Sequence, residues 1–355
     1  MSTGMLLGYE LPEAGLPDPT AFLLAVARKA EAAGVHHLVL GDRPAAGPAG
    51  PGTPASLVAA SLLAVSTSRI GLVMTAAPAY NEAYNLARMV ASVDHISHGR
   101  AGWRVVTGPD AAADANHRRE GVDPLTDREA RAREFVPVVQ NLWDTWEDGA
   151  FVHEKGTGRF IDSGRVHVLD HRGTLRVRGP LNVVRPPQGH PVVLADAADP
   201  LVSAHADVLT VGDPDSAPTA AQAGGRPRLG VVTPFVAATE ERARELHELA
   251  GAPASDRGRA VLTGTPRQVA ERLGAWFDRG AVEGFTVRFP APAPEGGAAS
   301  TDGVAEFTDA VLPLLTAAGR FPATYTSDTL RGHFGLTRPA NRFAERIAAA
   351  GPERN

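Results

Sequence analysis

Residues 80–88, YNEAYNLAR, and residues 92–107, SVDHISHGRAGWRVVT, decide the fold class of this chain. The first part has the apolar spacing of an amphipathic helix, and the segment from Gly102 onward is a short apolar run typical of a buried strand. The run ends at Thr107-Gly108, which is the end of a strand at which an α/β barrel carries its site. A helix that leads directly into a buried strand is the repeating unit of parallel α/β folds.

Short apolar runs alternate with amphipathic helices along most of the chain. Strands are expected at 6–11, 37–41, 70–76, 102–107, 192–195, 208–211, 229–235 and 284–289. Helices are expected at 19–33, 56–66, 82–96, 127–146, 240–250, 266–279 and 304–318. Eight largely apolar strands with helices between them predict an α/β fold, a (β/α)8 TIM barrel. An open, doubly wound sheet is the alternative, because periodicity does not show whether a sheet closes.

Residues 1–355 are interpreted as one domain with two additions to the barrel. Residues 151–184 interrupt the alternation, and the sequence VHVLDHRGTLRVR at 166–178 predicts a β-hairpin inserted before the fifth barrel strand. Residues 320–355 form a C-terminal extension that wraps the barrel or makes oligomer contacts. Residues 213–225 are rich in small residues, so we expect the sixth helix to be reduced or missing.

The composition excludes several classes of protein. The chain has 355 residues, 43% of them hydrophobic, and a formal net charge of −5 without a basic patch, which argues against nucleic-acid binding. No apolar run is long enough to span a membrane and no signal peptide is recognised, so we expect a cytoplasmic protein. Cysteine is absent, which excludes disulfides and thiolate catalysis. His95 and His98 are three apart on a helix but lack an acidic third ligand nearby, so no metal site is expected.

Three side chains at or near predicted strand ends are candidates for catalysis. Asp42 follows the second strand and could accept a proton or orient a substrate, or form a salt bridge with Arg43 or Arg88. Arg104 lies in the fourth strand and, if buried, needs a carboxylate or an anionic ligand. His117, in the long loop after that strand, could act as a general acid or base. Neither a glycine-rich nucleotide motif nor Gly-x-Ser-x-Gly is present.

The opening stretch resembles the flavin-dependent monooxygenases of the nitrilotriacetate and dibenzothiophene-sulfone type, a branch of the bacterial luciferase-like group. The likeness continues through LWDTWED at 142–148, LDHRG at 169–173, PQGHPV at 187–192 and TLR at 329–331. It extends over nearly the whole chain. The resemblance implies a barrel that uses reduced FMN from a separate flavin reductase, together with molecular oxygen, to oxidise a small organic substrate.

The resemblance also implies where the flavin would lie. Thr75, Ala76 and Ala77 end the third strand and would support the isoalloxazine ring, and a cis peptide bond is expected between Ala76 and Ala77. The remaining expected cofactor contacts are Arg104, Thr107 and Arg118. As a member of this group, the chain is expected to form a homodimer or a higher homo-oligomer.

Several residues at this expected flavin site depart from the family pattern. Arg104 stands where the family has Asn, and Gly108 stands where it has Ser. Leu125 and Glu129 replace a His and a Tyr, and Ala55 aligns near an acidic position. After the fifth strand, residues 195–200, ADAADP, replace a Gln-Ala-Gly-Ser-Ser-type phosphate loop. The aspartates would place negative charge against a phosphate, and the proline removes an N–H donor.

These departures leave two alternatives to the flavin monooxygenase. One is an enzyme that uses the same barrel for flavin-independent chemistry on a small molecule; its candidate residues are Asp42, Arg104, His117, Glu129 and Asp196. The other is a catalytically silent partner subunit that stabilises an active paralogue.

Overall fold

A computed structural model describes residues 4–13, 16, 18–45, 52–117, 128–250, 259–289 and 302–345. Nine strands form its central sheet. They are β1 (Leu6–Glu10), β2 (His37–Leu40), β3 (Gly71–Ala76), β4 (Ala101–Val105), β9 (Val192–Asp196), β10 (Val208–Val211), β11 (Arg228–Val236), β12 (Ala260–Gly264) and β13 (Gly284–Arg288). Their order is β10-β9-β4-β3-β2-β1-β13-β11-β12, and β10 also pairs with β11.

The pairing of β10 with β11 closes the sheet into a ring. Thr210 of β10 faces Leu229 of β11, and all strand pairs of the ring are parallel. Eight of the nine strands therefore form a (β/α)8 barrel, which confirms the expected fold, and the open-sheet alternative is wrong. The ninth strand, β12, was not expected from the sequence; it pairs with the second half of β11 and begins where Ala260 N donates to Gly212 O at the end of β10.

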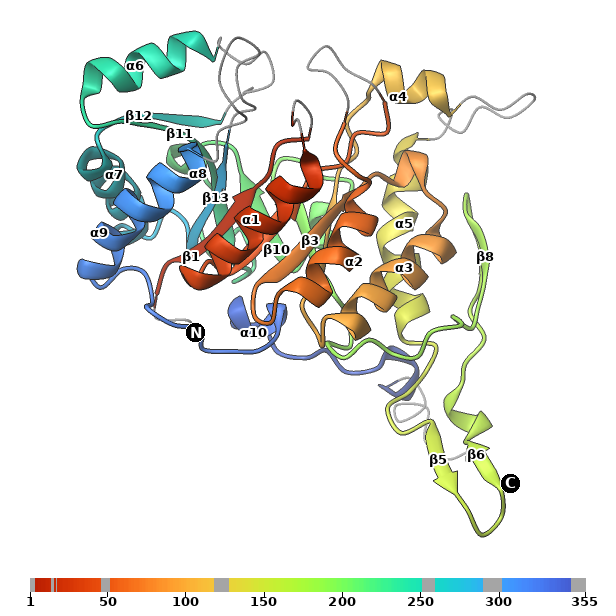
Figure 1. Cartoon of the computed structure of the whole chain (residues 1–355). Helices are drawn as coiled ribbons and strands as arrows, with labels where there is room; N and C mark the ends of the chain where they lie inside the picture. Colours follow the sequence, from red (N-terminus) through yellow and green to blue (C-terminus); the bar gives the residue numbers. More distant parts are fainter. Residues whose placement is uncertain are drawn as a thin grey trace.

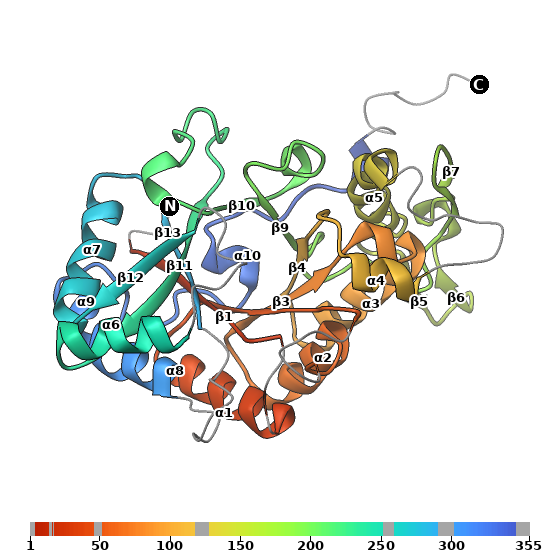
Figure 2. The same ribbon diagram turned by 90° about the horizontal axis from the view of Figure 1, so that it is seen from above.

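Helices surround the barrel (Figures 1 and 2). The longer ones are α1 (Pro19–Ala32), α2 (Ser56–Ser66), α3 (Ala83–Ile96), α5 (Arg128–Trp143), α6 (Glu240–Leu249) and α7 (Pro266–Asp278). The shorter ones are α4 (Ala111–Asn116), α8 (Asp302–Glu306), α9 (Leu312–Ala317) and α10 (Leu330–His333), with a π-helical turn at Phe307–Val311. None of the described helices is long and apolar enough to cross a membrane.

Two details of the helices bear on the sequence analysis. The segment after β4, expected to be a loop, contains α4, whose six residues are too few to show a helical period in the sequence. After β10, the described residues contain a single 3₁₀ turn, η4 (Pro214–Ser216), so the sixth helix is reduced as expected.

A layer of apolar side chains fills the half of the barrel that lies away from the carboxyl ends of the strands. Its strand residues are Leu6, Val39, Val73, Val192, Leu194, Val208 and Leu229. Leu330 and Phe334, from the C-terminal extension, pack against this layer. Figure 1 shows α10 beneath the strands, and Figure 2 shows it within the outline of the ring. The extension thus closes the end of the barrel opposite the carboxyl ends of the strands.

Two glycines make room for this plug. A Cβ atom on Gly71 would lie 2.3 Å from Leu330 Cδ1, and one on Gly102 would lie 2.8 Å from Leu330 Cδ2. Both distances are shorter than real Cβ contacts, so any other residue at either position would push Leu330 aside. The two glycines of β3 and β4 are therefore part of the seal.

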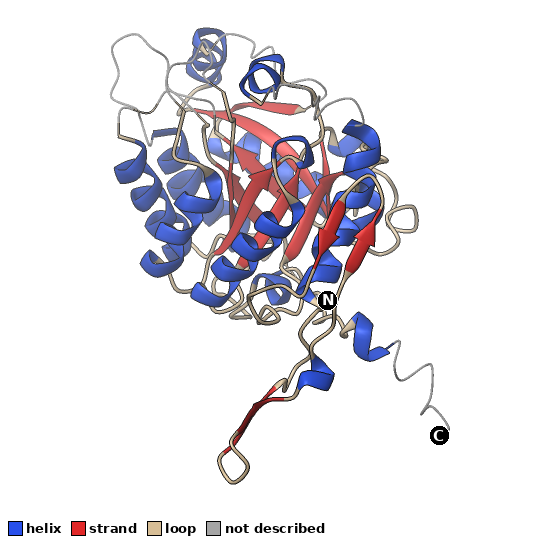
Figure 3. Ribbon diagram, turned by 90° about the vertical axis from the view of Figure 1, so that its right-hand side faces the viewer, coloured by secondary structure: helices blue, strands red, loops and turns tan. Residues whose placement is uncertain are grey.

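Two antiparallel hairpins lie between α5 and β9. One pairs β5 (Phe151–Glu154) with β6 (Arg159–Ile161), and the other pairs β7 (Asp170–Arg172) with β8 (Arg176–Arg178). The second confirms the hairpin expected from the alternating sequence. The first projects away from the barrel (Figures 1 and 3), and every residue of its strands is exposed, so no burial pattern marked it.

Glu134 on α5 fastens the turn of the β7–β8 hairpin. Its carboxylate lies 3.0 Å from His171 Nε2 and accepts hydrogen bonds from Thr174 N (3.1 Å) and Leu175 N (3.0 Å). These contacts, the one with His171 first, lower the pKa of Glu134 to about 2. The hairpin is therefore tied to the barrel by an ionised carboxylate.

The peptide bond between Ala76 and Ala77 is trans, so the expected cis bond is wrong. Within the described ranges the cis peptide bond is Gly179–Pro180. Ala77 has an ordinary extended conformation (φ −93°, ψ 132°) and leads into the 3₁₀ turn η1 (Pro78–Tyr80). Arg131 of α5 fixes this turn by donating to Pro78 O and Asn81 O, so a trans chain reaches it without strain.

Replacing Leu330 by Ala should destabilise the fold by about 2–5 kcal/mol, because it leaves a cavity below a close-packed layer. Urea denaturation followed by circular dichroism measures the loss. Leu314→Ala on α9 is the matched control, because Leu314 is 39% exposed and its truncation should cost less than about 1 kcal/mol. Equal losses in the two variants would contradict the sealing role of Leu330.

Replacing Glu134 by Ala should speed amide hydrogen exchange at Thr174 and Leu175, since both amides lose their acceptor. Glu129→Ala is the control on the same helix, where Glu129 pairs with exposed Arg133. The folded-state pKa of Glu134 is lowered, so its contribution is present above its ordinary pKa of 4.5 and is lost as the pH falls toward about 2. Amide exchange at Thr174 and Leu175 in the wild type and in Glu134→Ala should therefore converge as the pH falls from 4.5 toward about 2. A difference that persists at pH 2 would refute the role of Glu134 in fastening the hairpin.

Candidate active site at the barrel mouth

A pocket of about 990 Å³ lies at the carboxyl ends of β1, β2, β3, β4 and β13. This is the end of a parallel barrel where sites are found. We call it the mouth pocket. Its lining includes four carboxylates and two guanidinium groups, which are Glu10, Glu13, Asp42, Asp110, Arg43 and Arg288. The rest of the described lining is largely small or apolar, and includes Leu11, Ala55, Ala76, Ala77, Gly108 and Phe289.

Arg104 lies beside this pocket at the centre of an ion cluster. Alternation along β4 sends Trp103 outward, where its ring packs 5.9 Å from that of Phe135 on α5, and Arg104 inward. Arg104 Nη1 lies 2.9 Å from Glu10 Oε1, and Nη2 lies 3.8 Å from Glu13 Oε1. Its Nε donates to Thr75 Oγ1 at 3.0 Å. The partner that a buried Arg104 requires is therefore a carboxylate of this chain.

The ion cluster shifts the pKa values of its members in opposite directions. Burial alone would raise the pKa of Glu10, but the charges of Arg104 and Arg288 outweigh burial and hold it below its ordinary value. Burial alone would lower the pKa of Arg104, but the charge and hydrogen bond of Glu10 raise it. Burial raises the pKa of Glu13 despite the nearby Arg104, and the charge of Glu10 adds to that rise. Glu10 and Arg104 therefore form a firmly ionised pair, and Glu13 is the carboxylate that protonates more readily.

Asp42 binds the first residue of α2 and does not form the salt bridges considered from the sequence. It accepts hydrogen bonds from Ser56 N (3.2 Å) and Ser56 Oγ (3.1 Å), while Arg43 pairs with Asp110 at 3.0 Å. Burial raises the pKa of Asp42, and the two bonds from Ser56 act against that rise. Because its carboxylate lines the mouth pocket, a proton-accepting role for Asp42 stays a prediction.

His117 lies at the end of α4, against the ring of Tyr80. The two ring centres are 4.7 Å apart, and His117 Nδ1 lies 2.8 Å from Ala113 O. Tyr80 OH donates to Asp114 at 2.6 Å, and Asp114 also accepts from Arg128. His117 and Tyr80 both line the mouth pocket, so the structure brings His117 to the site.

The remaining candidates from the sequence either do not line the mouth pocket or fall outside the described residues. Glu129 pairs with Arg133 on the exposed face of α5, and neither it nor Asp196 lines the mouth pocket. Arg118 and Leu125 fall outside the described residues, so the expected cofactor contact of Arg118 stays a prediction.

Small side chains form part of the lining of the mouth pocket. Ala76 and Ala77 present small side chains there, and Ala76 O accepts a hydrogen bond from Trp103 Nε1 at 3.0 Å, which fixes the backbone. A Cβ atom on Gly108 would meet nothing within 4 Å, so the rim above is open. The isoalloxazine ring of FMN would find room here, but Thr107, another expected contact, already donates its hydroxyl to Asp199.

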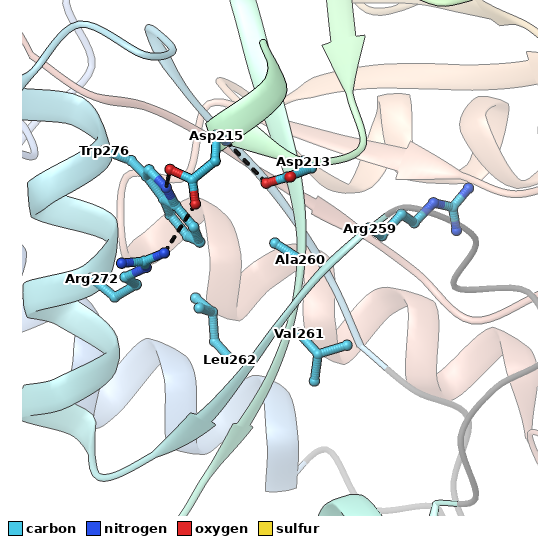
Figure 4. Close-up of a pocket in the computed structure, with 8 residues that line it drawn as sticks. All are labelled: Asp213, Asp215, Arg259, Ala260, Val261, Leu262, Arg272 and Trp276. Atoms are coloured by element: carbon cyan, nitrogen blue, oxygen red, sulfur yellow. Dashed lines mark hydrogen bonds and ion pairs between the residues drawn. The ribbon is translucent and has the colours of Figure 1, made fainter.

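A second hollow, of about 370 Å³, lies between β12, η4 and α7 (Figure 4). Asp215 accepts hydrogen bonds from Trp276 Nε1 and Arg272 Nη2, both at 3.0 Å, and pairs with Arg279. The Arg272 guanidinium lies 4.5 Å from the centre of the Trp276 ring. These contacts join η4 to α7, so Asp215 acts as a structural clamp. Among the described residues no group of three His, Asp or Glu side chains could hold a metal ion.

The closed barrel and its mouth pocket define a (β/α)8 protein with a site at its strand ends. The model of the luciferase-like monooxygenase family matches residues 1–252. N-acetyl-S-(2-succino)cysteine monooxygenase of Bacillus subtilis is 32% identical, over 80% of this chain and 82% of that protein. Nitrilotriacetate monooxygenase component A of Aminobacter aminovorans is 34% identical, over 82% of this chain and 80% of that protein.

A solved structure agrees with these relatives. EDTA monooxygenase from Chelativorans sp. BNC1 superposes with a TM-score of 0.77 and 25% identity, over 94% of this chain and 99% of that one. The chain therefore belongs to the luciferase-like monooxygenase family, which confirms the resemblance drawn from its sequence.

Glu10 and Glu13 are the site residues that the sequence reasoning missed. Glu10 ends β1, whose other residues are apolar or glycine, and it is 4% exposed. A lone carboxylate in one buried strand and a lone guanidinium in another are complementary, and that is the signal that could have found the pair.

Replacing Glu10 by Gln should lower the free energy of unfolding by about 3 kcal/mol, because Arg104 then keeps a buried charge with a weaker partner. Thermal and urea denaturation measure the change. Glu82→Gln is the control, since the Glu82 side chain is 60% exposed and lies 3.6 Å from Arg131; it should cost less than about 1 kcal/mol. The double variant E10Q/R104M should recover part of the loss. If E10Q cost no more than E82Q, the pair would not be the anchor described here.

Proposed function

We propose that this chain is a monooxygenase that oxidises a small organic molecule in the mouth pocket, with a reduced flavin supplied by a separate flavin reductase. The observation that carries the proposal is the mouth pocket itself, a cavity of about 990 Å³ at the strand ends of a luciferase-like barrel. Its volume is in the range of small-molecule sites. The names of its relatives, which include nitrilotriacetate and EDTA monooxygenases, support the same reaction class.

The residues of the pocket have separable roles in this proposal. Ala76 and Ala77 would support the flavin ring, and a bound reduced flavin would supply the activation of molecular oxygen. Glu10 lines the pocket and is held in place by Arg104, which in turn donates to Thr75; Glu10 would orient the substrate. His117 and Asp42 both line the pocket and are groups that could exchange a proton with the substrate.

The two alternatives drawn from the sequence have no better support. A flavin-independent site built on Glu129 or Asp196 is disfavoured, because neither residue lines the mouth pocket. A silent partner subunit would have no need of an open pocket at the strand ends. A cytoplasmic location and a homodimeric or higher assembly are further parts of the proposal and stay predictions.

Replacing Gly108 by Leu should lower substrate turnover by about tenfold or more, because the new side chain enters the open rim of the pocket. Oxygen consumption and product mass spectrometry measure turnover with a flavin reductase, NADH and a panel of small amines, thioethers and sulfones. Gly156→Leu is the matched control, since a Cβ atom there also meets nothing within 4 Å and Gly156 lies far from the pocket in the β5–β6 turn. No flavin-dependent oxidation of any substrate by the wild-type chain would refute the proposal.

A further inference from the structure

We infer that the described part of this barrel mouth has no seat for a phosphate dianion, so that flavin is held through its ring and not through its phosphate. The inference rests on the proposed function for the presence of a flavin. It is carried by three independent features of the described residues: the loop after β9, the helix ends around the mouth pocket, and the pairing of the nearby arginines.

The loop after β9 closes its hydrogen bonds on itself. A phosphate binds where backbone N–H groups are free to point at it. Every N–H group of residues 197–201 is already used, and residue 200 is a proline, which has none. The pairs are Ala197 N with Thr210 O, Asp199 N with Asp196 O, Ala198 N with Asp196 Oδ1 and Leu201 N with Asp199 Oδ1, at 2.9–3.1 Å.

The same loop carries two carboxylates without a cationic partner in the described part of the chain. Asp196 is exposed, and neither it nor Asp199 forms an ion pair with a described Lys, Arg or His side chain. The hydroxyl of Thr107, a group that could otherwise donate to a phosphate, donates to Asp199 instead. A phosphate placed against residues 197–201 would meet two like charges and no free backbone N–H group.

The helices that begin at the mouth pocket offer no substitute seat. The positive end of α2 is occupied by Asp42, which accepts from Ser56 N. The positive end of α4 is occupied by Asp110, which accepts from Ala112 N (3.0 Å) and Ala113 N (3.2 Å). The N-cap of α3 is Glu82, whose carboxylate lies 3.6 Å from Arg131 Nη2. The ends of α2 and α4 that could attract an anion therefore already have one.

The arginines near the mouth pocket are also engaged. Arg43 pairs with Asp110 at 3.0 Å, and Arg104 pairs with Glu10 at 2.9 Å. Arg288 Nε lies 3.9 Å from Glu10 Oε1. To bind a phosphate, Arg43 or Arg104 would have to leave a carboxylate behind, and for Arg104 that carboxylate is buried. The ring position against Ala76 and Ala77 carries no such conflict.

Binding titrations of FMN and riboflavin test the inference, because the two differ by the phosphate alone. Flavin fluorescence quenching gives both Kd values, with oxidised flavins in air and with reduced flavins under anaerobic conditions. We expect riboflavin to bind more tightly than FMN at low salt, and the FMN Kd to approach that of riboflavin as salt screens the repulsion. Wild-type protein that binds FMN about tenfold or more tightly than riboflavin would overturn the inference.

A charge-neutral variant tests the loop directly. The double variant D196N/D199N keeps the oxygens that accept the loop amides but removes both charges. It should tighten FMN binding by about tenfold while the riboflavin Kd changes less than about twofold. D213N is the matched control, because Asp213 makes the same turn at the end of the neighbouring β10 by accepting from Asp215 N; it should change neither Kd.

The outcomes separate this inference from the proposed function. If the wild type bound neither flavin, the proposed function would fail, and the double variant would decide the inference alone. FMN binding gained by D196N/D199N would support the inference even then, and no gain would overturn it. If the double variant does not fold, the salt dependence of the wild-type FMN-to-riboflavin ratio decides, and a ratio insensitive to salt would overturn it.

Discussion

Closure of the eight-stranded ring is the constraint on which the rest of this structure depends. Once β10 pairs with β11, no strand of the ring keeps a free edge, and the inward-facing side chains must share a fixed volume. Away from the carboxyl ends of the strands, that volume is filled by an apolar layer and by Leu330, for which Gly71 and Gly102 leave space. Toward the carboxyl ends of the strands, the volume is occupied by Glu10, Thr75 and Arg104.

The upper half of the barrel can be polar only because its charges are compensated within the chain. A buried guanidinium without a partner would destabilise the fold, and Glu10 provides that partner. The same compensation decides what the pocket can bind. Since Arg104 and Arg43 already have carboxylates, and the nearby helix ends have Asp42 and Asp110, the site favours ligand parts without strong negative charge. Stability and ligand preference are thus two consequences of one arrangement.

Much of the barrel could be predicted from the sequence, because strands buried on both faces are largely apolar and the eight ring strands are so apart from single polar residues such as Glu10 and Arg104. The strand β12 could not, since its residues are only partly buried and its alternation is weak. The contact of Asp42 with the start of α2 could not either, because its partner Ser56 lies fourteen residues further on, across a segment with no periodic pattern.

The sequence predicted several residues of the candidate site but not the contacts that they make. The sequence placed Asp42, Arg104 and His117 near strand ends, and the structure brings all three to or beside the mouth pocket. It also indicated that Asp196 and Asp199 oppose a phosphate. The partner of Arg104, however, depends on strand register across the ring. The hydrogen bonds of the N–H groups in the loop after β9 depend on three-dimensional contacts. Neither leaves a mark in local sequence.

The most direct test is a crystal structure of the chain grown with reduced riboflavin under anaerobic conditions. The account predicts density for the flavin ring against Ala76 and Ala77, beside an unbroken Glu10–Arg104 pair, with the loop at 196–203 unchanged and out of contact with the ligand. A ring bound elsewhere, or an Arg104 turned away from Glu10 to meet the ligand, would contradict it.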